Sequence, residues 1–323
     1  MDIRMTTVTP RERWLAVLNR RKPDRIPTDL WCTDEVLERL KRDLNCPDDE
    51  TLYRRLHIDR PHHVDAPFRP MAPCRWAHHP DDPQANIWGV RLTPVDYGTG
   101  VYLEYTHHPL ADATSVADVE AFRWPQVEWF DFDALEPDFA AADGSRPVQA
   151  ARYEPFLLAC QMRGMEQAFM DLLAEPAVIE AVLTRIFEFF FEYNRRVFEA
   201  GRGRIDLFYL AEDLGQQKGP LMSLETYRRF LKPNQIRMAD LARKYDIHIL
   251  YHTDGAAGIF LRDLIDDVGI EILNPIQWRC PGMERDRLVR QFGRRVAFHG
   301  AMDNQQTLPF GSVQDVVDEV KEN

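Results

Sequence analysis

Several features that define familiar classes of protein are missing from this chain. The five cysteines, at positions 32, 46, 74, 160 and 280, are odd in number and include no Cys-x-x-Cys pair. This usage argues against a disulfide scaffold and favours a reducing compartment. No apolar run approaches the roughly 20 residues that a membrane-spanning helix needs, and no basic segment followed by an apolar one marks a secretory signal. We therefore expect a cytoplasmic protein without membrane contact.

Signatures of nucleotide binding and of serine hydrolases are also missing. The sequence contains no Gly-x-Gly-x-x-Gly, no Gly-x-x-x-x-Gly-Lys-Ser/Thr and no Gly-x-Ser-x-Gly. Its formal net charge is -12, without a basic run. Because nucleic-acid binding normally leaves a basic patch in the sequence, we expect no nucleic-acid partner.

Apolar runs of strand length alternate with helical patterns through most of the chain. This rhythm predicts an α/β fold with a parallel sheet. With 323 residues and 45% apolar content, the chain can bury one large core, so we expect a single domain over residues 1–323. The predicted strands are 25–32, 62–66, 148–152, 205–211, 247–251, 271–274 and 296–299.

Seven strands with a final helix at 312–321 predict a (β/α)8 TIM-type barrel that lacks its eighth strand within this chain. A seven-stranded or open sheet is the alternative. Residues 86–106 interrupt the rhythm, because two strand-like segments flank the turn Asp96-Tyr97-Gly98-Thr99. This pattern is typical of a β-hairpin inserted into the barrel.

The segment Tyr251-His252-Thr253-Asp254-Gly255 is the most informative part of the sequence. It follows a buried apolar strand, at the end where barrel enzymes carry their active sites. Side chains two residues apart on a strand point the same way, so His252 and Asp254 are expected to converge. Such a pair suits a metal site or acid–base chemistry. The simpler alternative is that His252 hydrogen-bonds locally and Asp254 caps the next helix.

Other predicted strands end in polar side chains as well, which favours a shared site at one rim. Glu212 and Asp213 are adjacent, so at most one of them is expected to point inward. Five of the candidates also have a structural alternative: Asp213 and Asp303 could cap turns, Asn274 and Gln277 could bind backbone, and His299 could lie in the core. The rim candidates are Tyr153, Glu154, Glu212, Asp213, Gln217, His252, Asp254, Asn274, Gln277, His299 and Asp303.

These motifs, in this order, resemble the uroporphyrinogen decarboxylase superfamily, and its methyltransferase-like branch in particular. The resemblance covers nearly the whole chain, and its strength lies in the ordered set. The matching segments are Arg11-Glu12-Arg13, Pro23-Asp24-Arg25-Ile26-Pro27, Ile87-Trp88-Gly89-Val90, Met162-Arg163-Gly164, Asp213-Leu214-Gly215, Lys232-Pro233, His252-Thr253-Asp254-Gly255, Ile272-Leu273-Asn274-Pro275-Ile276-Gln277, Phe298-His299-Gly300 and Thr307-Leu308-Pro309-Phe310-Gly311.

The resemblance implies methyl transfer between a small methylated substrate and a corrinoid (cobalamin) protein, with zinc as the metal. In that branch zinc is held by a His-x-Cys pair and a later Cys; here the pair is His252 and Asp254, and a carboxylate can also bind zinc. The expected metal ligands are His252, Asp254 and Glu212. We expect catalytic roles for Asp213, Gln277 and His299. Substrate contacts are expected from Tyr153, Glu154, Gln217, Asn274 and Asp303.

Two other functions remain open from the sequence. The first is decarboxylation of a tetrapyrrole, although residues 29–34 lack the arginine-rich segment with which the decarboxylases hold substrate carboxylates. The second is corrinoid or tetrapyrrole binding without catalysis. The expected partners are a small methyl donor or acceptor and a corrinoid protein, with a second copy of the chain as a further candidate.

Overall fold

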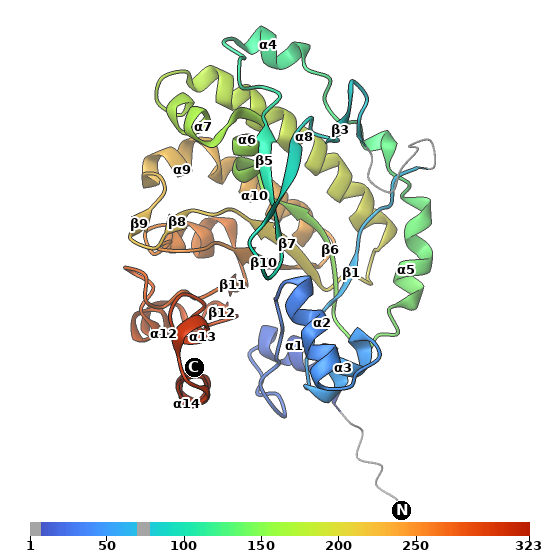
Figure 1. Ribbon diagram of the computed structural model, residues 1–323, viewed down its shortest axis with the longest axis vertical. Coiled ribbons are helices and arrows are strands. Elements are labelled where there is room, and N and C mark those ends of the chain that lie inside the picture. The colour runs from blue at the N-terminus through green and yellow to red at the C-terminus, as the bar shows by residue number, and fades with distance from the viewer. Residues whose placement is uncertain (1–7, 70–77) are drawn as a thin grey trace, which may run out of the picture.

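Six parallel strands form the centre of the computed structural model, which describes residues 8–69 and 78–323 (Figure 1). Neighbours in the sheet follow chain order, β1-β6-β7-β10-β11-β12, and each pair is parallel. This is the α/β class that the sequence predicted. The strands are β1 (His62–Val64), β6 (Val148–Tyr153), β7 (Leu207–Ala211), β10 (His248–His252), β11 (Ile272–Asn274) and β12 (Ala297–Phe298).

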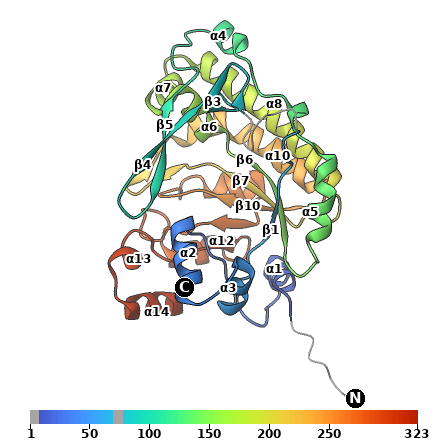
Figure 2. The same ribbon diagram turned by 45° about the vertical axis from the view of Figure 1, so that its right-hand side comes forward.

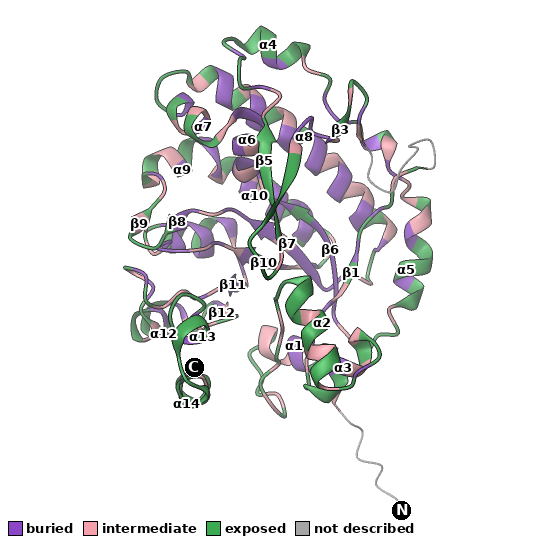
Figure 3. Ribbon diagram, viewed as in Figure 1, coloured by how far each residue is buried: buried purple, intermediate pink, exposed green. Residues whose placement is uncertain are grey.

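Helices occupy the connections, and the long helix α8 packs beside α10 against the sheet (Figures 1 and 2). Strands β7 and β10 are buried almost throughout, as parallel strands covered by helices are (Figure 3). None of the described helices combines the length and the apolar character needed to cross a membrane. The helices are α1 (Pro10–Leu18), α2 (Asp34–Asp43), α3 (Asp49–Arg55), α4 (Val116–Ala121), η1 (Val127–Trp129), η2 (Asp133–Leu135), α5 (Glu136–Ala141), α6 (Pro155–Arg163), α7 (Met165–Asp171), α8 (Pro176–Ala200), α9 (Leu224–Phe230), α10 (Lys232–Arg243), α11 (Leu261–Asp263), η3 (Leu264–Val268), α12 (Arg285–Phe292), α13 (Thr307–Phe310) and α14 (Val313–Glu322).

The prediction of a first strand at residues 25–32 is wrong. This segment pairs with no strand, and the described sheet does not close between β12 and β1. Side-chain contacts hold the segment instead: the buried Asp59 carboxylate accepts hydrogen bonds from the Thr28 amide and from Arg25. Pro27 also lacks the N–H that a ladder would require. The segment therefore runs past the open edge of the sheet as irregular chain.

The helical segment that follows Ser223 is divided in two at Leu231. Pro233 lies at the start of the second piece, where it needs no backbone N–H, whereas inside a continuous helix it would remove a hydrogen bond. Ser223 caps α9 by accepting a hydrogen bond from the Thr226 amide.

The predicted hairpin is confirmed. Strands β4 (Arg91–Asp96) and β5 (Val101–His107) pair in antiparallel fashion and extend a second sheet that begins with β2 (His78–His79) and β3 (Asp82–Asn86). The hairpin crosses over the main sheet towards α2, where Glu35 accepts a hydrogen bond from the Val101 amide at 3.3 Å (Figures 1 and 2). A small third sheet pairs β8 (Gly215–Gln216) with β9 (Gly219–Pro220).

A buried ion pair joins the end of α6 to α7. The Arg163 Nε atom lies 2.6 Å from Asp171 Oδ2, and the two side chains are 3% and 0% exposed. Arg163 also donates to the backbone carbonyls of Leu110 and Ala111, beyond the hairpin. Because a buried charge without a partner is strongly destabilising, this pair ties the hairpin connection to the barrel helices.

Replacing Asp171 by Ala is expected to lower the free energy of unfolding by about 3–5 kcal/mol, because it leaves the Arg163 guanidinium buried without a counter-ion. Chemical denaturation measures the change. The matched control is Asp240→Ala, which removes the partner of Arg243 from an exposed pair on α10. That change is expected to cost less than about 1 kcal/mol. Equal effects from the two variants would contradict the assigned role of the buried pair.

A second ion pair lies at the opposite, amino end of the sheet. The His248 Nδ1 atom is 2.6 Å from Glu271 Oε2, so the start of β10 is tied to the residue that precedes β11. The hydrogen bond to Glu271 raises the pKa of His248, although partial burial opposes the shift. A raised pKa in the folded state means that the pair stabilises the fold at low pH. This contribution is complete below the unfolded pKa of about 6.5 and disappears as the pH rises through the folded value.

Glu271→Gln should therefore reduce the free energy of unfolding near pH 6 and have a much smaller effect near about pH 9, where His248 is neutral in both states. The loss should stay below about 1 kcal/mol, because both side chains are partly exposed. Denaturant titrations at the two pH values test this. A loss of the same size at both values would show that the charge on His248 does not matter.

Candidate metal centre and substrate cavity

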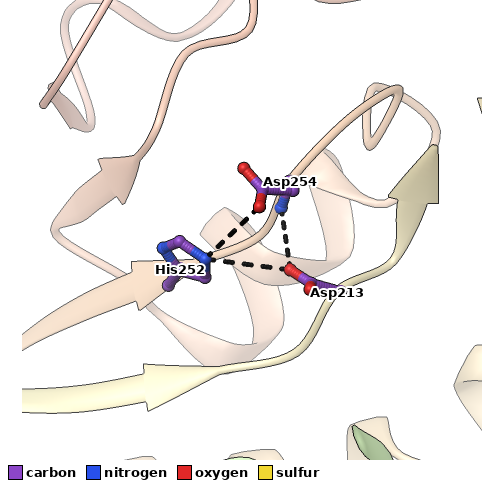
Figure 4. Close-up of side chains that lie close together, drawn as sticks. All are labelled: Asp213, His252 and Asp254. Carbon is purple, nitrogen blue, oxygen red and sulfur yellow. Dashed lines mark hydrogen bonds and ion pairs between the residues drawn. The ribbon is translucent and has the colours of Figure 1, made fainter. Parts of the chain in front are cut away.

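Three side chains converge at the carboxyl end of the parallel sheet. The His252 Nε2 atom, at the end of β10, lies 3.8 Å from Asp213 Oδ1 and 3.9 Å from Asp254 Oδ2 (Figure 4). One ligand atom from each of the three lies within 4.8 Å of the others. Two donors that are each about 2 Å from a shared zinc ion cannot be more than about 4 Å apart, so this set fits a divalent ion after a small side-chain movement.

The loops after β7 and β10 lie close together, which brings the two carboxylates to one place. The Asp254 amide donates to Asp213 Oδ1 at 3.1 Å, and the buried Thr253 hydroxyl accepts from the Leu214 amide. A Cβ atom on Gly255 would lie 2.5 Å from the carbonyl carbon of Gly215, and Gly255 has a φ of +72°. Only glycine therefore allows this approach without strain.

Asn274, at the end of β11, fixes the orientation of two imidazoles. Its Oδ1 atom lies 2.7 Å from His252 Nδ1, and its Nδ2 atom lies 2.5 Å from His299 Nδ1. With the amide oriented in this way, His252 carries its proton on Nδ1 and presents the Nε2 lone pair to the carboxylates. A neighbour that fixes the tautomer is usual for a histidine that binds a metal.

The electrostatics of the cluster favour a bound cation. Burial raises the pKa of Asp254; His252 opposes this shift, and repulsion from Asp213 adds to it. Among residues 8–69 and 78–323, no Lys or Arg forms an ion pair with Asp213 or Asp254. Two converging carboxylates without a basic partner are poorly stabilised, and a divalent ion would relieve their repulsion.

Gln277 holds Asp254 in place from the loop after β11. Its amide nitrogen donates to Asp254 Oδ1 at 2.9 Å, and its oxygen accepts from the Gly255 amide at 3.0 Å. Gln217 donates to the same oxygen at 2.8 Å. These contacts leave Asp254 Oδ2 directed at His252, so Gln277 acts as a positioning residue for the cluster.

A cavity of about 410 Å³ opens beside this cluster. Trp31 forms part of its wall and stacks on the His252 ring, with centroids 5.7 Å apart and planes at 19°. Tyr209 forms another part, 5.8 Å from the same ring. The cavity is of the size that small-molecule ligands occupy, and its walls adjoin the candidate metal ligands. Its lining residues are Leu30, Trp31, Cys32, Arg60, His63, Val64, Asp65, Gln149, Ala151, Arg152, Glu154 and Tyr209.

Glu154 lines the cavity and is close enough to the metal cluster for Asp213 and His252 to affect its carboxyl group. Burial raises the pKa of its carboxyl, and repulsion from Asp213 adds to the shift. A raised pKa favours the protonated form of a carboxyl group, and a protonated carboxyl can donate to a reacting group. Glu154 is thus a candidate proton donor at this site.

The irregular segment 25–32 supplies part of the site that a first strand was expected to supply. Asp29 Oδ2 lies 3.2 Å from His299 Nε2, and Asp29 Oδ2 also accepts from the Trp31 indole. Burial disfavours the charged form of Asp29, but His299, Trp31 and the Leu30 amide outweigh it, so the pKa of Asp29 is lowered. The carboxylate therefore anchors both His299 and the tryptophan that covers His252.

The structure brings several predicted rim residues together and sends others elsewhere. His252, Asp254, Asp213, Gln277, Asn274, His299 and Glu154 surround the cluster, with Gln217 behind Gln277. Asp303 lies further along this rim, where it pairs with Arg279 and caps the turn before α13 through the Gln305 and Gln306 amides. We assign Asp303 a structural role in place of the expected substrate contact.

Two expectations need correction. Glu212, expected as a metal ligand, is 1% exposed and accepts hydrogen bonds from the Phe156 and Leu157 amides. Its neighbour Asp213 points into the cluster instead and takes its place in the ligand set. Tyr153, expected at the substrate, is buried against Phe187 and Phe190. It belongs to the core.

Four residues near the site were not selected from the sequence: Asp29, Trp31, Arg60 and Arg152. Arg152 carried a usable signal, because an arginine in a strand that is mostly buried must reach solvent or a cavity. Asp29 and Trp31 lie in the segment mistaken for a strand. Nothing local in the sequence distinguishes Arg60 from other surface arginines.

The fold and the rim site together point to an enzyme of the barrel type, with its active site at the carboxyl ends of parallel strands. Residues 88–323, more than half of the chain, match the family model described as Uroporphyrinogen decarboxylase (URO-D), so the chain belongs to this family.

A solved methyltransferase from Methanosarcina mazei is similar in fold, with a TM-score of 0.64 and 20% sequence identity over 98% of this chain and 89% of that one. At this identity the likeness concerns the fold alone. No curated protein sequence matches the chain significantly.

Gly255→Ala is expected to destabilise the protein more than Gly98→Ala does. Both residues have positive φ, and an added Cβ at Gly98 would meet nothing within 4 Å. Gly98→Ala should therefore cost only the left-handed penalty of about 1–2 kcal/mol. Gly255→Ala should cost at least about 1 kcal/mol more, because its Cβ would collide with the Gly215 backbone. Equal free energies of unfolding for the two variants would refute the close approach of the loops.

Proposed function

We propose that this chain is a metal-dependent methyltransferase that moves a methyl group between a small methylated substrate and a corrinoid carried by a partner protein. The observation that supports the proposal most directly is the convergence of His252 Nε2, Asp213 and Asp254 beside a small-molecule cavity. Zinc is the ion that we propose for this set of one nitrogen and two oxygen donors.

Each residue has a role in this proposal. Asp213, His252 and Asp254 hold the metal, which would supply Lewis acidity at the heteroatom that carries or receives the methyl group. Asn274 keeps the His252 lone pair directed at the site, and Gln277 does the same for Asp254. Glu154, whose pKa burial raises, is the proposed proton donor to the leaving heteroatom. Trp31 and Tyr209 cover His252 and limit its contact with water.

Decarboxylation of a tetrapyrrole that bears several carboxylates receives less support. The cavity walls contain the carboxyl groups of Asp65 and Glu154, with Asp29 close by. A substrate with many carboxylates would meet these groups at short range and leave several of its own charges unpaired. A small substrate with few charges avoids that repulsion.

Elemental analysis of the purified protein tests the metal first. We expect about one zinc per chain when zinc is supplied and no chelator is used, as three protein ligands to one ion imply. His252→Ala should lose it. The matched control is His248→Ala, at the other end of the same strand, which should retain the metal. A wild-type chain without metal under these conditions would reject the zinc centre and favour decarboxylation.

The transfer itself can be followed through the visible absorbance of cobalamin, supplied either chemically reduced as cob(I)alamin with the methylated substrate or as methylcobalamin with the demethylated acceptor. The spectrum changes when Co(I) gains a methyl group or when methylcobalamin loses one. His252→Ala should abolish the change and His248→Ala should not. Metal binding without methyl transfer to or from any methylated substrate would reject the proposed reaction while leaving the metal centre in place.

A further inference from the structure

The cavity beside the metal cluster contains hydrogen-bond donors that no described residue uses. Arg152 is exposed at the end of β6, and its guanidinium forms no ion pair or hydrogen bond with residues 8–69 or 78–323. Among the same residues, the Arg60 guanidinium donates a hydrogen bond only to a neutral group, the Tyr53 hydroxyl, at 2.7 Å. Both arginines line the cavity without a carboxylate partner in the described chain, so both are available to a ligand.

An irregularity in β6 directs Arg152 into this cavity. The register against β7 shifts between Gln149 and Arg152, so β6 has one extra residue there, and Ala151 takes a φ of +64°. Without this bulge, residues three apart would point to opposite faces of the sheet. With it, Gln149 and Arg152 both line the cavity. Bulges that redirect a side chain are common beside active sites, and a non-glycine residue at positive φ is strained, so the arrangement indicates a function.

Neutral donors accompany the two arginines. The Gln149 side chain is buried at the cavity wall and makes no hydrogen bond to the described residues. The Tyr209 hydroxyl also lacks a partner there, and burial raises its pKa, so it stays protonated and able to donate. Two guanidinium groups, an amide and a hydroxyl on one cavity match the demand of an oxyanion for several directed donors.

Acidic groups line the same cavity and limit how many anions can enter. Asp65 is exposed to solvent, and Glu154 is close enough to Arg152 for the guanidinium to oppose the rise in the pKa of Glu154 that burial causes. The donors therefore suit one anionic group at Arg60 and Arg152, because a second one would be repelled by Asp65 and Glu154. Trp31 and Tyr209 join the cavity to the metal cluster through their contacts with His252.

We propose that Arg60 and Arg152, assisted by Gln149 and Tyr209, form a subsite for a single oxyanionic group of the substrate. The inference rests on the proposed methyl transfer for the chemical identity of the group at the other end of the substrate. The substrate is then a small molecule with a carboxylate, phosphonate or sulfonate at one end and a methyl-bearing heteroatom at the other. The oxyanion binds at the arginines, and the heteroatom reaches Asp213, His252 and Asp254.

Binding of methoxyacetate and of its neutral amide, methoxyacetamide, tests the subsite by calorimetry on the full chain with zinc supplied. The pair differs only in the charged group. Methoxyacetate should bind at least about 10-fold more tightly, since hydrogen bonds to charged groups are typically worth that much. Inorganic sulfate should compete with it. Arg60→Gln and Arg152→Gln should each weaken methoxyacetate binding by about 10-fold or more and leave the binding of methoxyacetamide nearly unchanged.

The control is Arg294→Gln, an exposed arginine before β12 at the opposite end of the sheet, which should bind methoxyacetate as the wild type does. Equal binding of the two probes, no binding of methoxyacetate at millimolar concentration, or unchanged binding in both arginine variants would overturn the subsite.

His252→Ala separates this inference from the proposed function. Retained arginine-dependent binding in a variant without metal supports the subsite, even if no methyl transfer is ever found. Binding that is lost in His252→Ala and kept in both arginine variants would mean that the carboxylate binds the metal. This result would reject the arginine subsite and leave the proposed metal centre unchanged.

Discussion

A single amide, that of Asn274, sets the geometry on which the rest of the site depends. It lies between two imidazoles, accepting from His252 with its oxygen and donating to His299 with its nitrogen. Because an amide has one acceptor end and one donor end, its orientation fixes the proton on each ring. His252 is left with a free Nε2 lone pair facing two carboxylates, and His299 is left facing Asp29. The positions of the protons on these groups thus depend on side chains from five separate segments of the chain.

The cluster also depends on backbone contact between loops that are distant in the sequence. Gly215 and Gly255 approach so closely that neither could carry a Cβ atom without displacing the other loop. This approach holds Asp213 and Asp254 together although like charges repel. Burial raises the pKa of Asp254, and repulsion from Asp213 adds to the rise. Because the fold holds two carboxylates together despite their mutual repulsion, binding of a cation between them would be favourable.

The open side of the sheet has been turned into binding surface. Residues 25–32 pair with no strand, yet hydrogen bonds to the ion-paired Asp59 hold them in place. Asp29 can therefore contact His299, and Trp31 can stack on His252. On the other side of the cavity, the bulge in β6 turns Arg152 inward. Both irregularities break the regular pattern of strands, and both place polar or aromatic side chains beside the candidate metal ligands, as expected where function competes with local preference.

The sequence by itself determined the α/β class, the parallel strands after residue 60, the hairpin and the pairing of His252 with Asp254, because strand periodicity and turn residues act over a few neighbours. It also indicated that one rim would carry the polar side chains. Only the tertiary structure decided whether Glu212 or Asp213 joins the metal cluster and whether Tyr153 or Arg152 lines the cavity. It also decided that residues 25–32 do not form a strand. Those outcomes depend on the Phe156 and Leu157 amides, a register shift against β7 and the carboxylate of Asp59. Each of these partners becomes a neighbour only when the chain has folded, so no local pattern encodes it.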